Sequence, residues 1–194
     1  ARVSPDGRYA AFTVFVLGHS YADAQMSTAT FLMDTTTGKP LANLEEFAIW
    51  QQGKLLQSPD INFWGMTFAH DSNFFYATLR TNGKIYLVHG DIKARKVTTI
   101  YENVECPSLS PDEKRIAFKK LVSRAFWRLT VLDLTTFKET PLAEVKSVDD
   151  QAEWLDNDHV LYAGVDPAPP PWMSVMVVPA DGSGKPQVYA SGAL

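Results

Sequence analysis

Carboxylates are the side chains best suited to chemistry in this sequence. Asp149, Asp150 and Glu153 fall within five positions, and Glu105 lies at the equivalent position of the preceding sequence repeat. Carboxylates that a fold gathers in a cleft can bind a cation, a polar ligand or a peptide. The alternative interpretation is that they are the solvated ends of strands. We predict a ligand or partner contact at these four residues and keep the alternative open.

Two tryptophans are further candidates for partner contact. Trp64 and Trp172 are predicted to contact a partner, because Trp side chains often anchor protein interfaces. The alternative is that they pack in the core between sheets. Trp172 follows a stiff proline-rich run, residues 167–171, which we predict as an exposed loop between two strands. That loop is either a rigid turn or a partner contact.

No catalytic residue, metal site or cofactor is predicted. The four histidines show no HxH or HxxxH spacing, and Asp156-Asn157-Asp158 lacks the Gly and the distal Glu of a calcium loop. Gly182-Ser183-Gly184 is a polar turn rather than a G-x-S-x-G elbow, because Asp181 stands where the first Gly is needed. The single cysteine, Cys106, excludes an intramolecular disulfide, and we expect it to be a buried packing residue.

The composition is that of a globular protein and excludes several function classes. The 194 residues are 45% apolar, and 18 Lys and Arg against 22 Asp and Glu give a net charge of −4. The basic residues are scattered, so we predict no nucleic-acid partner. No apolar run approaches the ~20 residues that span a bilayer, so we predict no membrane insertion by this segment. The chain opens without a signal-peptide pattern, and we expect any signal or anchor to lie upstream in the natural protein.

The elements that must position these side chains are repeated. Four segments share a turn around an Asp followed by an alternating β run, with the Asp anchors at positions 6, 71, 112 and 156. The spacings are 65, 41 and 44 residues, and the last two match the ~40–45 residues of a four-stranded, WD40-like propeller blade. A blade cannot bury both of its faces alone, so the blades must stack. A β-sandwich with coincidental turns is the alternative, and four anchors in register disfavour it.

Each repeat is predicted to be a meander of four strands, and the chain to be nearly all-β. The four β runs that follow the anchor strands are Ala29–Asp34, Ile85–His89, Leu129–Leu134 and Ser174–Val178. The whole chain, residues 1–194, is predicted to be one domain with blades at approximately 1–60, 61–104, 105–148 and 149–194. Residues 47–50 and 55–56 are predicted as an extra hairpin inside the first repeat.

The repeats resemble those of TolB-like β-propellers. The resemblance rests on Ser4-Pro5-Asp6-Gly7-Arg8, on Ser110-Pro111-Asp112 and on Val131-Leu132-Asp133-Leu134, and it covers nearly the whole chain. The stretches Asn62–Phe68 and Glu105–Ser110 are similar to uncharacterised actinobacterial members. The resemblance implies an extracytoplasmic protein, periplasmic or associated with the cell envelope. It also implies a ring of six blades, of which this chain supplies about four, so two blades are expected to be absent.

The function predicted from the sequence is that of a non-catalytic, exported β-propeller that binds a protein, peptide or ligand. The alternative is the propeller portion of a larger hydrolase of the prolyl-oligopeptidase type, or of a lyase. The full-length gene product distinguishes the two, because a downstream α/β domain with a serine elbow would favour the alternative. Fold alone does not decide between them.

Overall fold

The computed structural model describes residues 1–19, 26–165 and 172–192, and the chain forms two compact units, Ala1–Glu105 and Cys106–Leu194. A three-residue 3-10 helix, η1 (Leu44–Glu46), is the one helical element in the described ranges. All other regular structure there is β, which confirms the all-β prediction. No helix in the described part of the chain is long and apolar enough to cross a membrane.

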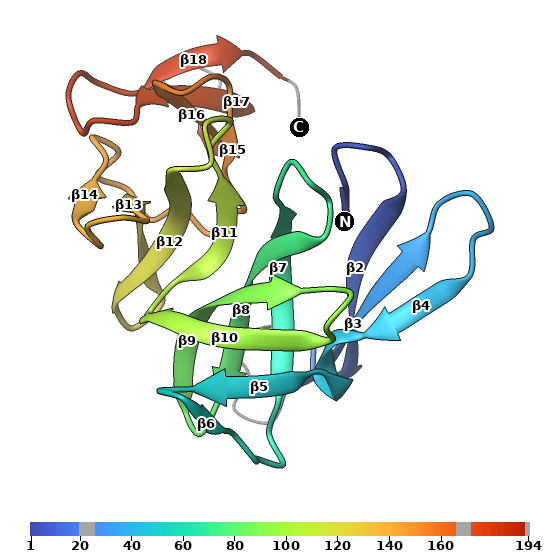
Figure 1. Ribbon diagram of the computed structural model, residues 1–194. Coiled ribbons are helices and arrows are strands. Elements are labelled where there is room, and N and C mark those ends of the chain that lie inside the picture. Colours follow the sequence, from blue (N-terminus) through green and yellow to red (C-terminus); the bar gives the residue numbers. More distant parts are fainter. Residues whose placement is uncertain (20–25, 166–171, 193–194) are drawn as a thin grey trace. The chain divides into compact units, whose positions relative to one another are not determined.

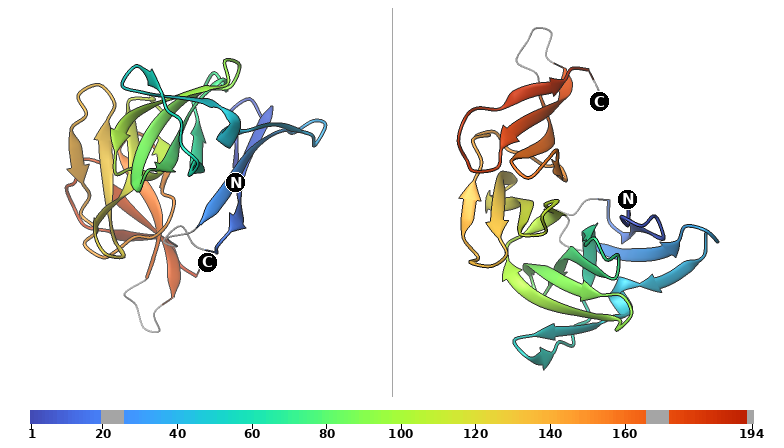
Figure 2. Two further views of the ribbon diagram at one scale, coloured as in Figure 1. Left: turned by 90° about the horizontal axis from the view of Figure 1, so that it is seen from below. Right: turned by 45° about the horizontal axis from the view of Figure 1, so that its top comes forward.

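The first sheet of the first unit is a four-stranded antiparallel meander with the order β1-β2-β3-β4 (Figure 1). Its strands are β1 (Arg2–Val3), β2 (Tyr9–Leu17), β3 (Ser27–Asp34) and β4 (Pro40–Asn43). Successive strands lie side by side and the sheet twists strongly, as the further views in Figure 2 show. These are the four strands predicted for one blade.

The second sheet has the same meander and two additional strands. The meander consists of β7 (Asn62–Phe68), β8 (Phe74–Thr81), β9 (Lys84–Asp91) and β10 (Lys96–Glu102). The hairpin β5 (Ala48–Gln51) and β6 (Lys54–Leu55) extends it, because β5 pairs in parallel with β10 (Figure 1).

The hairpin belongs to a different sheet from the one predicted. The hairpin itself was predicted, but the boundary at residue 60 assigned it to the first repeat, whereas its hydrogen bonds join it to the second sheet. The physical reason is burial: Ile49 lies opposite Val97 in the pairing, and both side chains are buried. An apolar strand gains more beside β10 than it would as a free hairpin.

The second unit contains two further four-stranded meanders, with the orders β11-β12-β13-β14 and β15-β16-β17-β18. The strands of the first are β11 (Glu105–Leu109), β12 (Arg115–Ser123), β13 (Phe126–Asp133) and β14 (Glu139–Pro141). Those of the second are β15 (Glu153–Trp154), β16 (His159–Val165), β17 (Met173–Pro179) and β18 (Gln187–Ala190). The described residues therefore form four blade-like sheets, two in each unit.

The Asp anchors close the turns as predicted. Ser4 Oγ donates to Asp6 Oδ1 at 2.7 Å and accepts the backbone N–H of Tyr9 at 2.8 Å. Ser110 and Asp112 repeat this arrangement, with an Oγ to Oδ1 distance of 2.6 Å. These hydrogen bonds favour the ionised carboxylates and lower the pKa of both Asp side chains.

Each unit has its own core of aromatic and aliphatic side chains. In the first unit Phe63, Phe75 and Leu79 are fully buried. In the second, Leu129 of the third sheet belongs to the same cluster as Tyr162 of the fourth, so these two sheets pack face to face. This is the stacking that an isolated blade requires.

The first strands of the second and third meanders, β7 and β11, share a backbone irregularity. Gly65 on β7 and Cys106 on β11 each stand six residues before an anchor Asp, and their φ angles are +61° and +49°. Such left-handed residues are typical of β-bulges. Cys106 is buried, as predicted.

Candidate functional site

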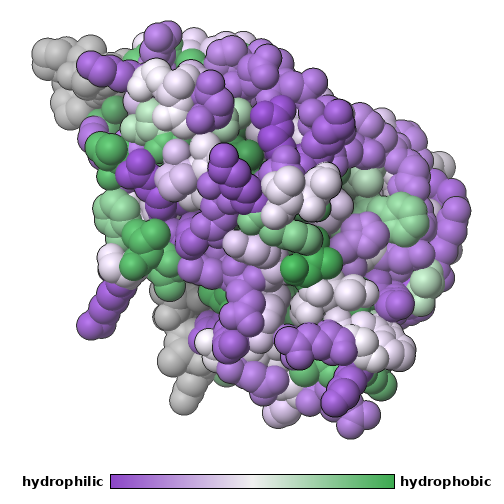
Figure 3. Space-filling view, turned by 60° about the vertical axis from the view of Figure 1, so that its left-hand side comes forward, coloured by the Kyte–Doolittle hydropathy of each residue, from purple (hydrophilic) through white to green (hydrophobic). Residues whose placement is uncertain are grey.

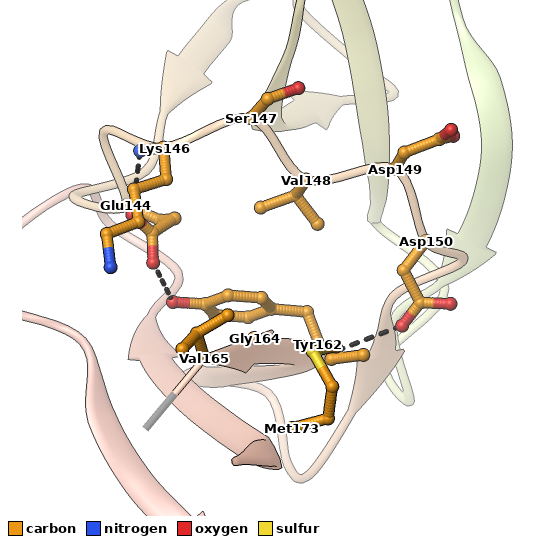
Figure 4. A pocket seen from close by; sticks show the side chains of 11 residues that line it. Glu144, Lys146, Ser147, Val148, Asp149, Asp150, Tyr162, Gly164, Val165 and Met173 are labelled. Atoms are coloured by element: carbon orange, nitrogen blue, oxygen red, sulfur yellow. Dashed lines mark hydrogen bonds between the residues drawn. The ribbon is translucent and has the colours of Figure 1, made fainter. Parts of the chain in front are cut away.

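A pocket of about 270 Å³ opens in the second unit, between β16 and the segment 144–150 that follows β14 (Figure 4). Met173, the first residue of β17, also lines the pocket. The charged and large side chains among the described lining residues are Glu144, Lys146, Asp149, Asp150, Tyr162 and Met173. The pocket therefore combines acidic, basic, aromatic and apolar groups within one unit.

The segment 144–150 is anchored on the third sheet. The backbone N–H of Val148 donates to the carbonyl of Trp127 at 3.0 Å, and the backbone N–H of Trp127 donates to Ser147 Oγ at 3.0 Å. The Val148 side chain is buried in the core of the unit. This anchoring holds the acidic side chains on either side of Val148 at the pocket.

Glu144 and Tyr162 form the buried end of the pocket. The Tyr162 hydroxyl donates to Glu144 Oε2 at 2.6 Å, and the backbone N–H of Lys146 donates to Glu144 Oε1 at 2.8 Å. Burial raises the pKa of the Tyr162 phenol, and the hydrogen bond and negative charge of Glu144 raise it further. Tyr162 is therefore a neutral hydrogen-bond donor at physiological pH.

Asp150 occupies the opposite end. Its Oδ2 accepts the backbone N–H of Ala163 at 2.9 Å, and its Oδ1 accepts the backbone N–H of Gln151 at 2.8 Å. Figure 4 shows Glu144 at the hydroxyl end of Tyr162 and Asp150 near its backbone end. The two carboxylates thus flank the same aromatic side chain.

Asp149 forms an ion pair with Lys119 of β12. The Lys119 side chain is only 4% exposed, and its ammonium lies 4.9 Å from the centroid of the Trp127 ring. Asp149 itself is mostly exposed. Its charge is therefore already balanced within the unit, in contrast to those of Glu144 and Asp150.

The predicted acidic residues are only partly brought together. Asp149 and Asp150 both line the pocket. Glu153 lies on β15, where its Oε1 accepts hydrogen bonds from Ser108 Oγ at 3.4 Å and from the backbone N–H of Trp154 at 3.1 Å. Glu105 is buried at the start of β11. Neither Glu153 nor Glu105 is among the described residues of the pocket wall.

The two predicted tryptophans have opposite environments. Trp64 is fully buried in β7, so the prediction that its ring contacts a partner is wrong, and the core alternative holds. Burying this large ring removes more apolar surface from water than any exposed position could. Trp172 is 62% exposed beside the pocket residue Met173, so it stays available. The proline-rich run 167–171 lies outside the described residues.

Glu144, Lys146 and Tyr162 were not among the site residues predicted from the sequence. Tyr162 lies in an alternating β run, where a Tyr that becomes buried needs a hydrogen-bond partner for its hydroxyl. Glu144 follows Leu142-Ala143, but Asp133 follows the similar pair Val131-Leu132 without being buried, so the sequence alone carries no signal for the burial of Glu144.

Other candidate chemistry is sparse in the described ranges. No group of three or more His, Cys, Asp and Glu side chains there is arranged to hold a metal ion. Asp181 Oδ1 accepts the backbone N–H of Ser183 at 2.8 Å, so the Gly182-Ser183-Gly184 run is a polar turn as predicted. The face of the molecule in Figure 3 is mainly hydrophilic, with hydrophobic residues in small separate groups.

Comparison with solved structures identifies the fold. No protein-family model and no curated protein matches the sequence. TolB from Acinetobacter baumannii is similar in structure, with a TM-score of 0.66 and 16% identity over 99% of this chain and 43% of that protein. A puromycin-hydrolyzing peptidase of Mycobacterium tuberculosis has a TM-score of 0.59 and 14% identity, and the match covers 97% of this chain and 28% of that protein. An oligogalacturonate lyase of Vibrio parahaemolyticus has a TM-score of 0.56 and 14% identity, and the match covers 96% of this chain and 50% of that protein.

The fold of this chain is therefore that of a TolB-like β-propeller with four blades. At these identities the likeness concerns fold alone. The chain spans less than half of the length of the Acinetobacter TolB. Completion to six blades stays a prediction.

Proposed function

We propose that this chain is a non-catalytic β-propeller that binds a protein or peptide partner through the pocket between the segment 144–150 and β16. The observation that supports the proposal most strongly is the buried carboxylate of Glu144, held by Tyr162 at the end of an open pocket. Burying a carboxylate costs free energy, so its retention in a pocket is more readily explained by binding than by packing.

The neighbourhood of the pocket favours binding a macromolecule over binding a free small molecule. Val145 between Glu144 and Lys146 is 69% exposed, and Trp172 beside Met173 is 62% exposed. Exposed apolar side chains around a polar pocket resemble the mixed character of protein interfaces, in which aromatic residues and Met are enriched. A peptide or protein can cover these side chains while one of its residues enters the pocket.

The same geometry favours binding over catalysis. Ser147 is the serine among the described lining residues of the pocket, and its Oγ accepts a hydrogen bond from the backbone N–H of Trp127. Activation of a serine needs a base within hydrogen-bond reach, and no histidine is present among the described lining residues. The carboxylates are likewise engaged by backbone N–H groups and by the Tyr162 hydroxyl.

A second candidate function is the propeller portion of a larger hydrolase or lyase. It is supported by the coverage of 97% of this chain against 28% of the Mycobacterium peptidase, since most of that protein lies outside the similar region. The full-length gene product tests this candidate. An α/β domain with a G-x-S-x-G elbow, together with peptidase activity of the full-length protein, would support it over a purely binding role.

An extracytoplasmic location follows from the resemblance to TolB-like proteins, and we include it in the proposal. Fractionation of the natural host with an antibody to this chain tests it. We expect the protein in the extracytoplasmic or envelope fraction, and recovery with a cytoplasmic marker would contradict that part of the proposal.

Site-specific photo-crosslinking tests the binding proposal in the natural host. The photoreactive residue p-benzoylphenylalanine is placed at Met173 in the pocket wall or at Phe137, a similarly exposed residue in the β13–β14 turn of the same unit. We expect one defined adduct from position 173 that disappears when Asp150→Asn is added, and no such adduct from position 137. Absence of a pocket-dependent adduct would contradict the proposal.

A further inference from the structure

We infer that the pocket receives a basic side chain, an arginine or a lysine, from an extended segment of the partner whose neighbouring residues are apolar. This inference rests on the proposed function and specifies the chemistry of the partner. It is carried by the charge balance of the pocket, by the burial of Glu144 and by the apolar side chains around the opening.

The charges that line the pocket do not balance within this chain. Glu144, Asp149 and Asp150 contribute three carboxylates, and Lys119 forms an ion pair with Asp149. Lys146 is the remaining cation of the described wall, and its ammonium forms no ion pair with a described carboxylate. Lys146 can offset only one of the two remaining negative charges, those of Glu144 and Asp150. One additional positive charge is therefore needed to balance the pocket.

The partners of the two carboxylates are neutral donors. Glu144 is only 8% exposed, yet it is held by the Tyr162 hydroxyl and a backbone N–H group. Asp150 is held by two backbone N–H groups. Within the described residues no Lys, Arg or His lies within 4.0 Å of either carboxylate. Each carboxylate oxygen can accept more than one hydrogen bond, so both retain capacity for a charged donor.

A cation gains more in this pocket than on an open surface. Attraction between charges strengthens where surrounding protein lowers the effective dielectric constant, and Glu144 and Tyr162 are both buried. The volume of about 270 Å³ leaves room for a side chain rather than a whole protein element. A long basic side chain carries its charge at its end, which suits a pocket whose carboxylates line the interior.

The side chains around the opening indicate what flanks the basic residue. Val165 and Met173 of the pocket wall are each 44% exposed, and Trp172 and Val145 are more exposed still. Contact with these groups removes apolar surface from water only when the partner supplies apolar residues beside its basic one. An extended segment with the pattern apolar-basic-apolar supplies both the positive charge for the carboxylates and the apolar contacts around the opening.

The inference is tested by titrating the intact protein with acetyl-Leu-Arg-Leu-amide in a calorimeter. The control peptide carries citrulline, which has nearly the shape of arginine but no charge. We expect saturable binding of the arginine peptide that weakens as salt is added, and at least tenfold weaker binding of the citrulline peptide. Equal binding of both peptides, or binding of neither, would overturn the inference.

Three variants connect that binding to the pocket. Asp150→Asn should weaken binding of the arginine peptide about tenfold, whereas Asp158→Asn, in the exposed anchor turn of the same sheet, should leave it unchanged. Lys146→Gln removes the exposed competing cation and should strengthen binding severalfold. A gain of affinity cannot result from misfolding, so an unchanged or lower affinity of Lys146→Gln would contradict the inference.

The two proposals fail separately. If a pocket-dependent crosslink forms at Met173 but the arginine peptide does not bind, the partner does not insert a basic side chain, and the inference alone is wrong. If the crosslink is also absent, the proposed function is wrong as well.

Discussion

The Tyr162 hydroxyl and the Glu144 carboxylate are joined by a 2.6 Å hydrogen bond between the fourth sheet of the chain and the segment that leaves the third. Tyr162 lies on β16, and Glu144 begins the segment 144–150 that forms the opposite wall of the pocket. The bond therefore fixes the position of one wall relative to the other. Its loss should affect both the stability of the unit and the shape of the site.

Tyr162→Phe should lower the free energy of unfolding by about 1–3 kcal/mol, because a buried carboxylate loses a donor and gains no replacement. The matched control is Tyr189→Phe on β18 of the same sheet, where the side chain is mostly exposed. Urea denaturation measures both, and the control should change stability by less than about 0.5 kcal/mol. Equal effects of the two substitutions on the free energy of unfolding would show that the Tyr162 hydroxyl does not stabilise the unit more than an exposed hydroxyl does.

The raised pKa of Tyr162 predicts a loss of stability at alkaline pH. The folded state keeps the phenol proton to a higher pH than the unfolded state, whose Tyr titrates near the ordinary value of 10.0. The stabilisation is complete below that value and is lost as the pH rises above it. Thermal unfolding between pH 8 and 11 should therefore show a steeper decline in the wild type than in Tyr162→Phe, and parallel declines would argue against the assignment.

Glu45 should stabilise the first unit through its carboxylate. Its Oε2 accepts the backbone N–H of Thr30 on β3 at 2.8 Å, and its Oε1 accepts that of Phe63 on β7 at 3.2 Å. Burial raises the pKa of this carboxyl, so Glu45→Gln relieves a charge but places an amide N–H₂ against a backbone donor. We expect the second effect to dominate, with a net loss of about 1 kcal/mol or more in urea denaturation.

Glu46→Gln is the control for that substitution. Glu46 is mostly exposed and pairs with Arg95 at 3.2 Å, a surface ion pair of the kind worth about 0–1 kcal/mol. If Glu46→Gln destabilises as much as Glu45→Gln, the hydrogen bonds of Glu45 do not tie the two sheets together.

Gly90 on β9 should tolerate no side chain. A Cβ at this position would lie 2.0 Å from Cζ of the fully buried Phe75 ring on β8, so Gly90→Ala must displace a core aromatic. We expect a loss of at least about 1–3 kcal/mol, measured by urea denaturation. Gly7→Ala is the comparison, because its φ of +71° costs about 1–2 kcal/mol while nothing lies within 4 Å of the new methyl group. A cost for Gly90→Ala below about 1 kcal/mol would contradict the packing described.

The repeats were predictable because their signals are local. The turn at Asp112 is closed by hydrogen bonds within five residues, so its residue types already specify its geometry. The place of β5 was not predictable in the same way, since its partner β10 is almost fifty residues away in sequence. The contacts that place it, such as the pairing of Ile49 with Val97, exist only in the folded sheet.

The candidate site was predictable in part for the same reason. Asp149 and Asp150 are adjacent in sequence and could be recognised as a pair of carboxylates. Glu144 and Tyr162 are 18 residues apart, and the pairing of β16 with its neighbours brings them together. Trp64 could not be assigned from the sequence for a different reason. A Trp is common both in protein cores and at interfaces, and only its burial in the folded chain distinguishes the two.

The most direct test of the pocket as the binding site follows two backbone amides inside it. The Lys146 amide donates to Glu144 and the Ala163 amide donates to Asp150, so both should change their NMR chemical shifts when the arginine peptide binds. The Ser183 amide, in the Asp181 turn of the fourth sheet, makes a similar hydrogen bond outside the described pocket wall and should not shift. Saturable shifts at Lys146 and Ala163 with an unchanged Ser183 are the predicted result, whereas unchanged Lys146 and Ala163 amides at saturating peptide would contradict the account.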